Sequence, residues 1–206
     1  MFALIENQQI TKFYSGNKVV TLGDIQYPRS IFTLWSEAER NAIGIFEVTV
    51  DTTNKKDEQW YNNTNISYGV ESNKAVGSYG AATAKAIDDT LWTQEDSDNG
   101  YLPSDKSVGD VKVEGLKTIK KRIVKQQAAG ILADTDWYIT RKADAGTAVP
   151  SAVTTHRAAV RTKAAEMETA ITNAADTPAL ETLYTYTTND AGVTSRPLGE
   201  FPTLES

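Results

Sequence analysis

The sequence predicts an α+β fold, with a small β-rich domain at the N-terminus followed by a C-terminal helical hairpin or bundle. Three observations support this prediction. Short apolar runs separated by turn residues fill residues 1–50. Apolar side chains recur at helical spacing after residue 110. Residues that start and stop helices bracket those later segments, and a hydrophobic content of 40% is typical of an ordered globular chain.

The N-terminal segment has the pattern of strands with one short helix. Phe2–Tyr14 contains two apolar runs on either side of Glu6–Gln9, which predicts a strand pair joined by a turn. Ser36 and Glu39 have the S-x-x-E spacing of a capping box, so we predict a short helix there. Ile45–Val50 is apolar enough to predict a further strand.

The remainder of the predicted first domain, residues 1–80, is polar and rich in asparagines that favour turns. Trp60-Tyr61 and Ile66–Val70 are its apolar pieces, and we predict that they pair as an exposed hairpin. Gly77–Gly80 has the composition of a loop. Residues 81–113 are rich in acids and are predicted to connect the two halves of the chain.

Residues 114–190 are predicted to form a helical domain, followed by an extended tail over residues 191–206. The first helix is predicted over Val111–Leu132. Its expected buried stripe consists of Leu116, Ile119, Ile123 and Ile131. The basic residues of Lys117–Lys125 are then predicted to lie on the solvent-exposed faces of this helix rather than to form a nucleic-acid site. Thr177-Pro178 predicts the start of the last helix.

The segment Ala133–Ala170 predicts two helices joined by a short loop. Asp134 and Thr135 can cap a helix that begins directly after them. Trp137 and Arg141 are four residues apart, so they share one face of that helix. We predict that Trp137 is the core anchor of the hairpin and that Arg141 stacks on it or pairs nearby.

The second of these helices has its own start and stop signals. Gly146 suits the left-handed position after a helix end, and Pro150 and Ser151 then open a longer helix. Its predicted buried stripe consists of Val153, Val160, Ala164, Met167 and Ile171.

The sequence favours a protein without catalysis, metal or cofactor. The chain has no cysteine and a single histidine, His156, so a histidine-based zinc site lacks partners. Asp96–Gly100 superficially resembles a calcium loop, but the glycine and the closing acid are not at EF-hand positions. A net charge of −6 argues against nucleic acid as a partner, and no apolar run approaches the roughly 20 residues that a membrane span needs.

Four side chains are predicted to contact a partner. Trp60 and Tyr61 lie in the predicted exposed hairpin, and large amphipathic rings are enriched at protein interfaces. Phe201 and Leu204 lie in the tail, where prolines and recurring apolar residues favour an extended segment along a partner.

Two segments resemble a family of tailed bacteriophages. The first is Leu34–Ile45, with the sequence LWSEAERNAIGI. The second carries Thr135-Asp136-Trp137, Arg141-Lys142, Gly146, Pro150, Arg157 and Arg161. Together they resemble tail-fibre-assembly proteins and related tail proteins. The resemblance implies a structural or assembly protein that contacts tail-fibre or baseplate subunits, in the virion tail or in the host cytoplasm during assembly.

Several alternatives stay open at this point. The resemblance fits a chaperone that leaves the particle and a component that stays in it. A homo-oligomer is compatible with both, in a three-fold fibre or a six-fold baseplate. A different class is a receptor- or glycan-binding module of the tail that uses Trp60 and Tyr61 as exposed rings. A glycan-cleaving enzyme is the third class, because the chain holds many carboxylates whose spacing decides such chemistry.

Overall fold

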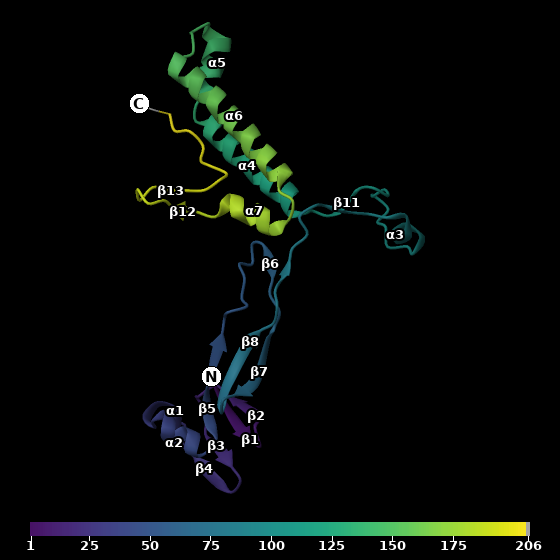
Figure 1. Ribbon diagram of the computed structural model, residues 1–206. Coiled ribbons are helices and arrows are strands. Elements are labelled where there is room, and N and C mark those ends of the chain that lie inside the picture. Colours follow the sequence, from purple (N-terminus) through teal and green to yellow (C-terminus); the bar gives the residue numbers. More distant parts are fainter. Residues whose placement is uncertain (205–206) are drawn as a thin grey trace. The chain divides into compact units, whose positions relative to one another are not determined.

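The computed structural model describes residues 1–204 and divides into two compact units, Met1–Thr83 and Ala84–Ser206. The predicted α+β class is confirmed. The largest sheet belongs to the first unit and the long helices belong to the second (Figure 1).

The first unit is built on a five-stranded sheet in the order β2–β1–β5–β8–β7. Its strands are β1 (Phe2–Glu6), β2 (Gln9–Tyr14), β5 (Ile45–Asp51), β7 (Ile66–Glu71) and β8 (Lys74–Tyr79). Neighbouring strands are antiparallel except for β5 and β8, which are parallel. The shorter elements are β3 (Val20–Leu22), β4 (Ile25–Tyr27), α1 (Ile31–Leu34), α2 (Glu37–Ala42) and β6 (Tyr61–Asn62).

The local predictions for the start of this unit are confirmed. β1 and β2 form the expected pair, and Asn7 and Gln8 in their turn have φ of 51° and 62°, as a type I′ turn requires. α2 carries the expected capping box. The Ser36 hydroxyl accepts a hydrogen bond from the Glu39 N–H, and the Glu39 carboxylate accepts one from the Ser36 N–H.

The core of the first unit gathers side chains from β1, β3, α1 and β5. Its buried members are Leu4, Val20, Ile31, Phe32 and Ile45. The sheet is curled, so its two edge strands approach each other. The rings of Phe13 on β2 and Tyr68 on β7 lie edge to face at 5.0 Å between centroids. The Gln8 amide also donates a hydrogen bond to Asn73 Oδ1 at 3.0 Å.

Two predictions for residues 60–80 are wrong. β7 pairs with β8 and not with the Trp60-Tyr61 segment, and most of the predicted loop Gly77–Gly80 is strand. Gly77 is part of a strand rather than a loop because of a close cross-strand contact. A Cβ at Gly77 would lie 2.7 Å from Cε1 of Tyr68, so the glycine makes room for that ring. This glycine marks a close approach rather than a turn.

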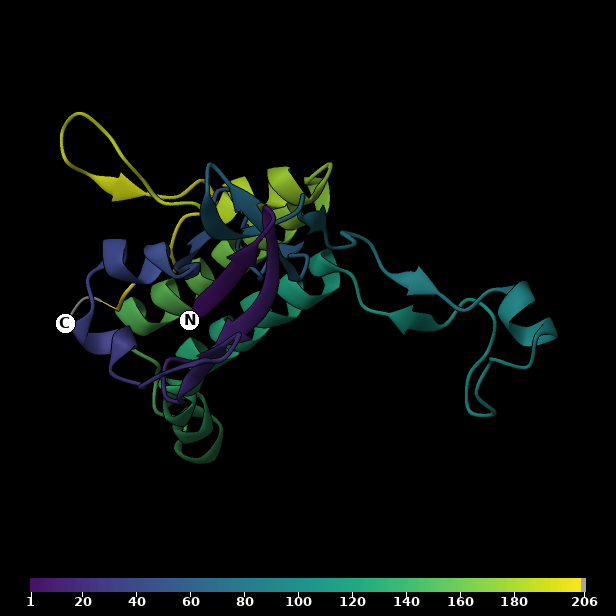
Figure 2. The ribbon, with the colours of Figure 1, turned by 90° about the horizontal axis from the view of Figure 1, so that it is seen from below.

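The second unit begins with an arm, residues 84–115, and continues as helices. The arm contains β10 (Thr90–Leu91), α3 (Gln94–Asp98) and β11 (Val111–Val113), while β9 (Thr83–Ala84) lies at the unit boundary. The helices are α4 (Leu116–Ala133), α5 (Asp136–Ala145), α6 (Ser151–Asn173) and α7 (Thr177–Tyr184). A small hairpin follows, made of β12 (Thr187–Thr188) and β13 (Thr194–Ser195). Figures 1 and 2 both show α4 and α6 side by side and the arm leading away from them.

The predicted first helix starts too early. α4 begins at Leu116 rather than at Val111, because Val111–Val113 pairs with Thr90–Leu91 across the arm. The segment 81–113, predicted as a connector, therefore contains regular elements of its own.

α4 and α6 pack against each other and form the helical core. The predicted stripe of α6 is confirmed, since all five of its residues are buried. On α4 the buried side chains are Leu116, Lys120, Val124 and Ala128, whereas the predicted Ile119, Ile123 and Ile131 are only partly buried. Lys120 has a polar head, but its stem is buried and its ammonium lies 4.9 Å from the centre of the Tyr184 ring. A sequence pattern that counts only apolar residues misses such a position.

Most of the predicted helix ends are confirmed. Gly146 ends α5 in the left-handed conformation, with φ of 67°, and α6 starts directly after Pro150. The start of α7 differs by one residue. Its cap is Asp176, whose carboxylate accepts a hydrogen bond from the Ala179 N–H, while Thr177 is the first helical residue.

Candidate interaction surfaces

Trp60 and Tyr61, two of the predicted partner contacts, do not form an exposed hairpin. Trp60 is only 4% exposed, and Tyr61 is half-buried. They follow Asp57 in a tight turn, in which the Asp57 carbonyl accepts hydrogen bonds from the N–H groups of both Trp60 and Tyr61. The prediction that Trp60 is an exposed contact is therefore wrong.

The prediction that Trp137 is a buried core anchor is also wrong, because this side chain is exposed. Trp137 is 51% exposed on α5. The predicted stacking is confirmed, because Cζ of Arg141 lies 4.7 Å from the centre of the Trp137 ring. The Tyr138 ring joins this group, with its centroid 3.8 Å from that of Trp137. Ile139 is also exposed, but it is two residues after Trp137 and therefore lies on another side of α5. We call Trp137, Tyr138 and Arg141 the aromatic stack.

Arg157 of α6 takes the anchoring role that we predicted for Trp137. It is 7% exposed, and its Nη1 donates hydrogen bonds to the Leu132 carbonyl at 2.7 Å and to Thr135 Oγ1 at 2.6 Å. Its Nη2 pairs with Asp136 at 2.8 Å. All three acceptors lie where α4 turns into α5, so one side chain fixes that turn. Thr135 serves this network and makes no side-chain cap to α5.

A signal for Arg157 exists in the sequence. The residue lies four positions after Val153 and three before Val160, so it occupies a place in the buried stripe of α6. A charged residue at a buried helix position needs partners that satisfy it. We interpreted the stripe from its apolar members alone and missed this residue.

The position of Trp137 changes what its removal should do. We expect Trp137→Ala to change the free energy of unfolding by no more than about 1 kcal/mol, because large losses come from buried side chains. Urea denaturation followed by circular dichroism measures this. A loss of about 3 kcal/mol or more would show that the ring is buried in solution, as the sequence predicts.

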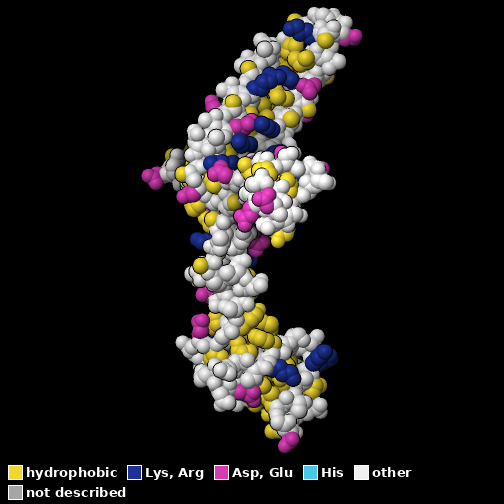
Figure 3. Space-filling model, turned by 90° about the vertical axis from the view of Figure 1, so that its right-hand side faces the viewer, with side chains coloured by type: hydrophobic (Ala, Val, Ile, Leu, Met, Phe, Trp, Pro, Cys, Tyr) yellow, Lys and Arg dark blue, Asp and Glu magenta, His cyan; other side chains and the backbone are white. Residues whose placement is uncertain are grey.

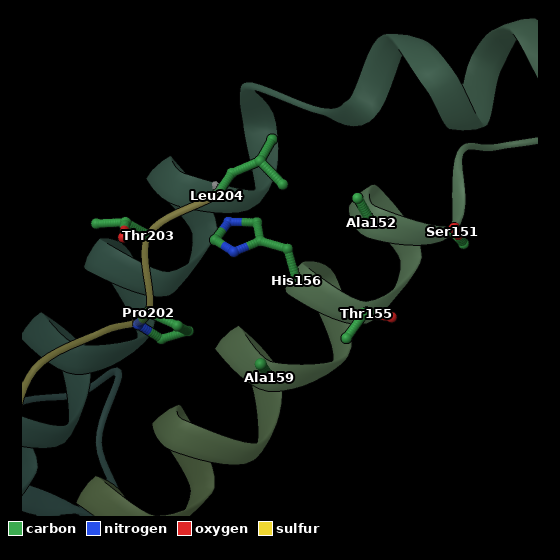
Figure 4. A pocket seen from close by; sticks show the side chains of 8 residues that line it. All are labelled: Ser151, Ala152, Thr155, His156, Ala159, Pro202, Thr203 and Leu204. Atoms are coloured by element: carbon green, nitrogen blue, oxygen red, sulfur yellow. The ribbon is translucent and has the colours of Figure 1, made fainter. Parts of the chain in front are cut away.

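The tail, with the predicted partner contacts Phe201 and Leu204, lies against this chain's own α6. Figure 4 shows His156 pointing from α6 toward Pro202, Thr203 and Leu204. Hollows of about 410 and 310 Å³ flank the tail there. His156 is buried, and its Nδ1 has no hydrogen-bond partner among residues 1–204. Phe201 is half-buried and Leu204 more exposed, so their role toward a partner stays a prediction.

One side of the arm is covered by side chains of the arm itself. Lys112 lies over the Trp92 ring, with its ammonium 4.6 Å from the ring centre and 2.6 Å from Oδ1 of Asp96. Asp96 also closes a capping box with Thr93 at the start of α3. These contacts tie the short helix to the ribbon of β10 and β11.

The other side of the ribbon is apolar and exposed. Leu91 lies opposite Val111 in the antiparallel ladder, and directly opposed residues share a face. Val113 is two residues further along β11, where the ladder is irregular, and it lies opposite Thr90. These three side chains are between 42% and 59% exposed. We call Leu91 and Val111, together with the exposed Val113 near them on β11, the apolar face of the arm.

We expect the Asp96 contacts to make the arm sensitive to acid. Hydrogen bonds from Lys112 and from the Thr93 N–H lower the pKa of Asp96 from 3.8 to about 2. Because the folded pKa is depressed, this carboxylate stabilises the arm above roughly pH 4, and the contribution is lost as the pH falls toward 2. We expect Lys112→Met to raise the pKa of Asp96 toward its ordinary value, measured by NMR titration of the carboxyl carbon. An unchanged pKa in the variant would contradict the contact.

Charge is distributed unevenly along the second unit. The arm, residues 84–115, holds eight acidic and three basic residues. Residues 116–163, which we call the basic helical half, hold ten basic and three acidic residues. On the face shown in Figure 3, Lys and Arg side chains lie next to hydrophobic ones along the helices. The two parts of this unit therefore carry opposite net charge, each with exposed apolar residues.

Two further properties concern residues 1–204. No helix in this range is both long and apolar enough to cross a bilayer. No group of three or more acidic or histidine side chains in this range is placed to hold a metal ion. Comparison of the chain with protein-family models, with curated proteins and with solved structures finds no match.

Proposed function

We propose that this chain is a non-enzymatic structural or assembly protein of a tailed bacteriophage. It acts through protein–protein contacts with tail-fibre or baseplate subunits, in the virion tail or in the host cytoplasm during assembly. The apolar face of the arm is the observation that carries the proposed mode of action. Leu91, Val111 and Val113 are exposed together on a two-stranded ribbon, and such ribbons are marginally stable in water without a further packing layer. Exposed apolar ribbons usually become interfaces.

The aromatic stack supports the same mode of action. It exposes Trp137 beside Tyr138 and Arg141, and these three residue types dominate binding energy at protein interfaces. The phage context comes from the resemblance of Leu34–Ile45 and of the helical segment around Trp137 to tail proteins.

Quantitative mass spectrometry of purified virions tests this proposal. A fixed ratio to the major tail proteins would identify a tail component. Absence from particles, together with fibreless virions when the gene is deleted, would identify an assembly chaperone. Absence from particles with normal virions after deletion would overturn the proposal.

A second candidate function is a receptor- or glycan-binding module of the tail. The exposed Trp137 ring favours it, because aromatic faces present apolar area for stacking. Binding of the purified chain to host cells, compared between wild type and Trp137→Ala, tests this candidate. Leu34→Ala, which also removes an exposed apolar side chain, is the matched control. Equal binding by all three proteins would exclude the aromatic stack as a receptor site.

A further inference from the structure

We propose that a hollow beside the first turns of α6 is a binding site for a carboxylate that carries a short apolar stem. The hollow has a volume of about 410 Å³ and is lined by α6 and by the tail. Figure 4 shows it from close by, with the His156 ring pointing from α6 toward the tail. We call it the α6 hollow. The inference goes beyond the proposed function and does not depend on it.

His156 is the observation that points to a ligand. Its side chain is only 8% exposed and lines the α6 hollow. Its Nδ1 is buried and has no hydrogen-bond partner among residues 1–204. Most buried polar groups in folded proteins have such a partner, because leaving one unpaired is costly. A ligand in the hollow that forms a hydrogen bond with the imidazole would remove this cost.

The N-terminus of α6 favours an anion as that ligand. α6 is 23 residues long, and the Thr154 N–H donates to the carbonyl of Pro150, the residue at the N-cap. The N–H groups of the first turn, residues 151–153, therefore have no acceptor within the helix, and the N-cap provides no side-chain hydrogen bond. Ser151 and Ala152 of this turn line the hollow. Free N–H groups and the helix dipole together attract negative charge at such a place.

The side chains around the α6 hollow fit a single negative charge. Ser151, Thr155 and Thr203 supply hydroxyl groups that can donate hydrogen bonds to it. No lysine or arginine is among the lining residues, so a doubly charged phosphate would lack the basic partners that suit it. Asp134 also lies near His156, but it lines the second hollow, of about 310 Å³, and is exposed, so water screens its charge. A carboxylate therefore fits this site better than a phosphate.

The remaining walls favour a short hydrocarbon stem on the ligand. Ala152 and Ala159 lie two turns apart on one face of α6. Pro202 and Leu204 line the hollow from the tail. A short alkyl chain against these side chains is removed from water, which favours binding. The volume of the hollow also lies within the range of about 300–1,000 Å³ that is usual for small-molecule sites.

Proton NMR of the purified full chain tests this site. His156 is the only histidine, so its ring Hε1 signal reports on the hollow without overlap from another histidine. The probe is sodium butyrate, a carboxylate with a short alkyl chain. We expect the Hε1 signal to shift and to saturate as butyrate is added, and to move much less in sodium chloride at the same ionic strength. A signal that responds to butyrate no more than to chloride would overturn the inference.

Butyramide separates the charge of the ligand from its shape. It has nearly the same shape as butyrate but carries no charge. We expect it to bind at least about tenfold more weakly, because the helix N-terminus favours a negative charge. Equal binding of the two compounds would overturn the assignment of a carboxylate site.

Two alanine variants show whether butyrate binds in this hollow. Saturation-transfer NMR observes the butyrate signals themselves and so measures binding in any variant. Ala152→Leu enlarges an exposed side chain that lines the hollow, and we expect binding to be lost. Ala158→Leu makes the same change at an exposed alanine of α6 outside the lining, and it should bind like wild type. Unchanged binding in Ala152→Leu, or equal loss in both variants, would place butyrate elsewhere and overturn the assignment.

Two histidine variants test the role of the imidazole. We expect His156→Leu to weaken butyrate binding at least about tenfold, and His156→Gln, which keeps a hydrogen-bonding group, to retain more of it. Both variants should stay folded, because no hydrogen bond of Nδ1 is lost within residues 1–204, and circular dichroism checks this. Wild-type affinity in a folded His156→Leu variant would overturn the assignment.

Glu205→Gln distinguishes an external carboxylate from one of this chain. Glu205 follows Leu204 in the sequence and lies outside the described residues. We expect butyrate to shift the Hε1 signal equally in this variant and in wild type. A response to butyrate in Glu205→Gln alone would overturn the external ligand, because the chain's own carboxylate would then occupy the hollow.

Discussion

Replacing Arg157 by leucine is expected to lower the free energy of unfolding of the second unit by about 3 kcal/mol. The substitution removes the hydrogen bonds to the Leu132 carbonyl and to Thr135 Oγ1, and it leaves a site shaped for a guanidinium. Most of the loss comes from these buried contacts. The ion pair with Asp136 contributes less, because that carboxylate is 61% exposed and water screens it.

Arg161 provides a matched control for this measurement. It lies one turn further along α6 and is exposed, and within residues 1–204 it makes only a long hydrogen bond of 3.4 Å to the Arg157 carbonyl. We expect Arg161→Leu to change stability by no more than about 0.5 kcal/mol. Urea denaturation followed by helical circular dichroism reports on the second unit, which holds the long helices. Equal losses in the two variants would mean that Arg157 does not anchor the turn between α4 and α5.

Replacing Gly115 by alanine is expected to destabilise the second unit by about 2–3 kcal/mol. A Cβ at this position would lie 2.3 Å from the carbonyl carbon of Asp88, so the backbone would have to move. The same place satisfies the start of α4. The Gly115 N–H donates to Asp89 Oδ1 at 2.6 Å, and the N–H groups of Leu116 and Lys117 donate to backbone carbonyls at the base of the arm. Moving the backbone therefore disturbs both the helix cap and the arm.

Gly130 in α4 is the natural comparison for Gly115. A Cβ added there meets nothing within 4 Å, and the residue lies inside the helix. We expect Gly130→Ala to stabilise the protein by about 0.5–1 kcal/mol, because alanine is the better helix former. Melting temperatures of the two variants should therefore move in opposite directions. A Gly115→Ala variant as stable as wild type would show that the base of the arm is loosely packed in solution.

The features that the sequence by itself determined depend on neighbours within a few residues. The turn at Asn7 and Gln8, the capping box of Ser36 and Glu39, and the left-handed Gly146 are examples. Backbone hydrogen bonds and allowed dihedral angles decide these features locally. The spacing of apolar residues also identified the buried stripe of α6, because apolar residues recur along it over several turns.

Only the tertiary structure decided which individual side chains lie inside. Periodicity predicts a helix but does not say which neighbour covers each face. Trp137 is therefore exposed and Arg157 buried, the reverse of what the polarity of their side chains suggests. Trp60 is buried, although it lies in a turn within a polar segment. Gly115 marks a place where a segment distant in the sequence, at Asp88, approaches within a few ångströms. Such contacts join residues far apart in the sequence, and local sequence patterns therefore do not predict them.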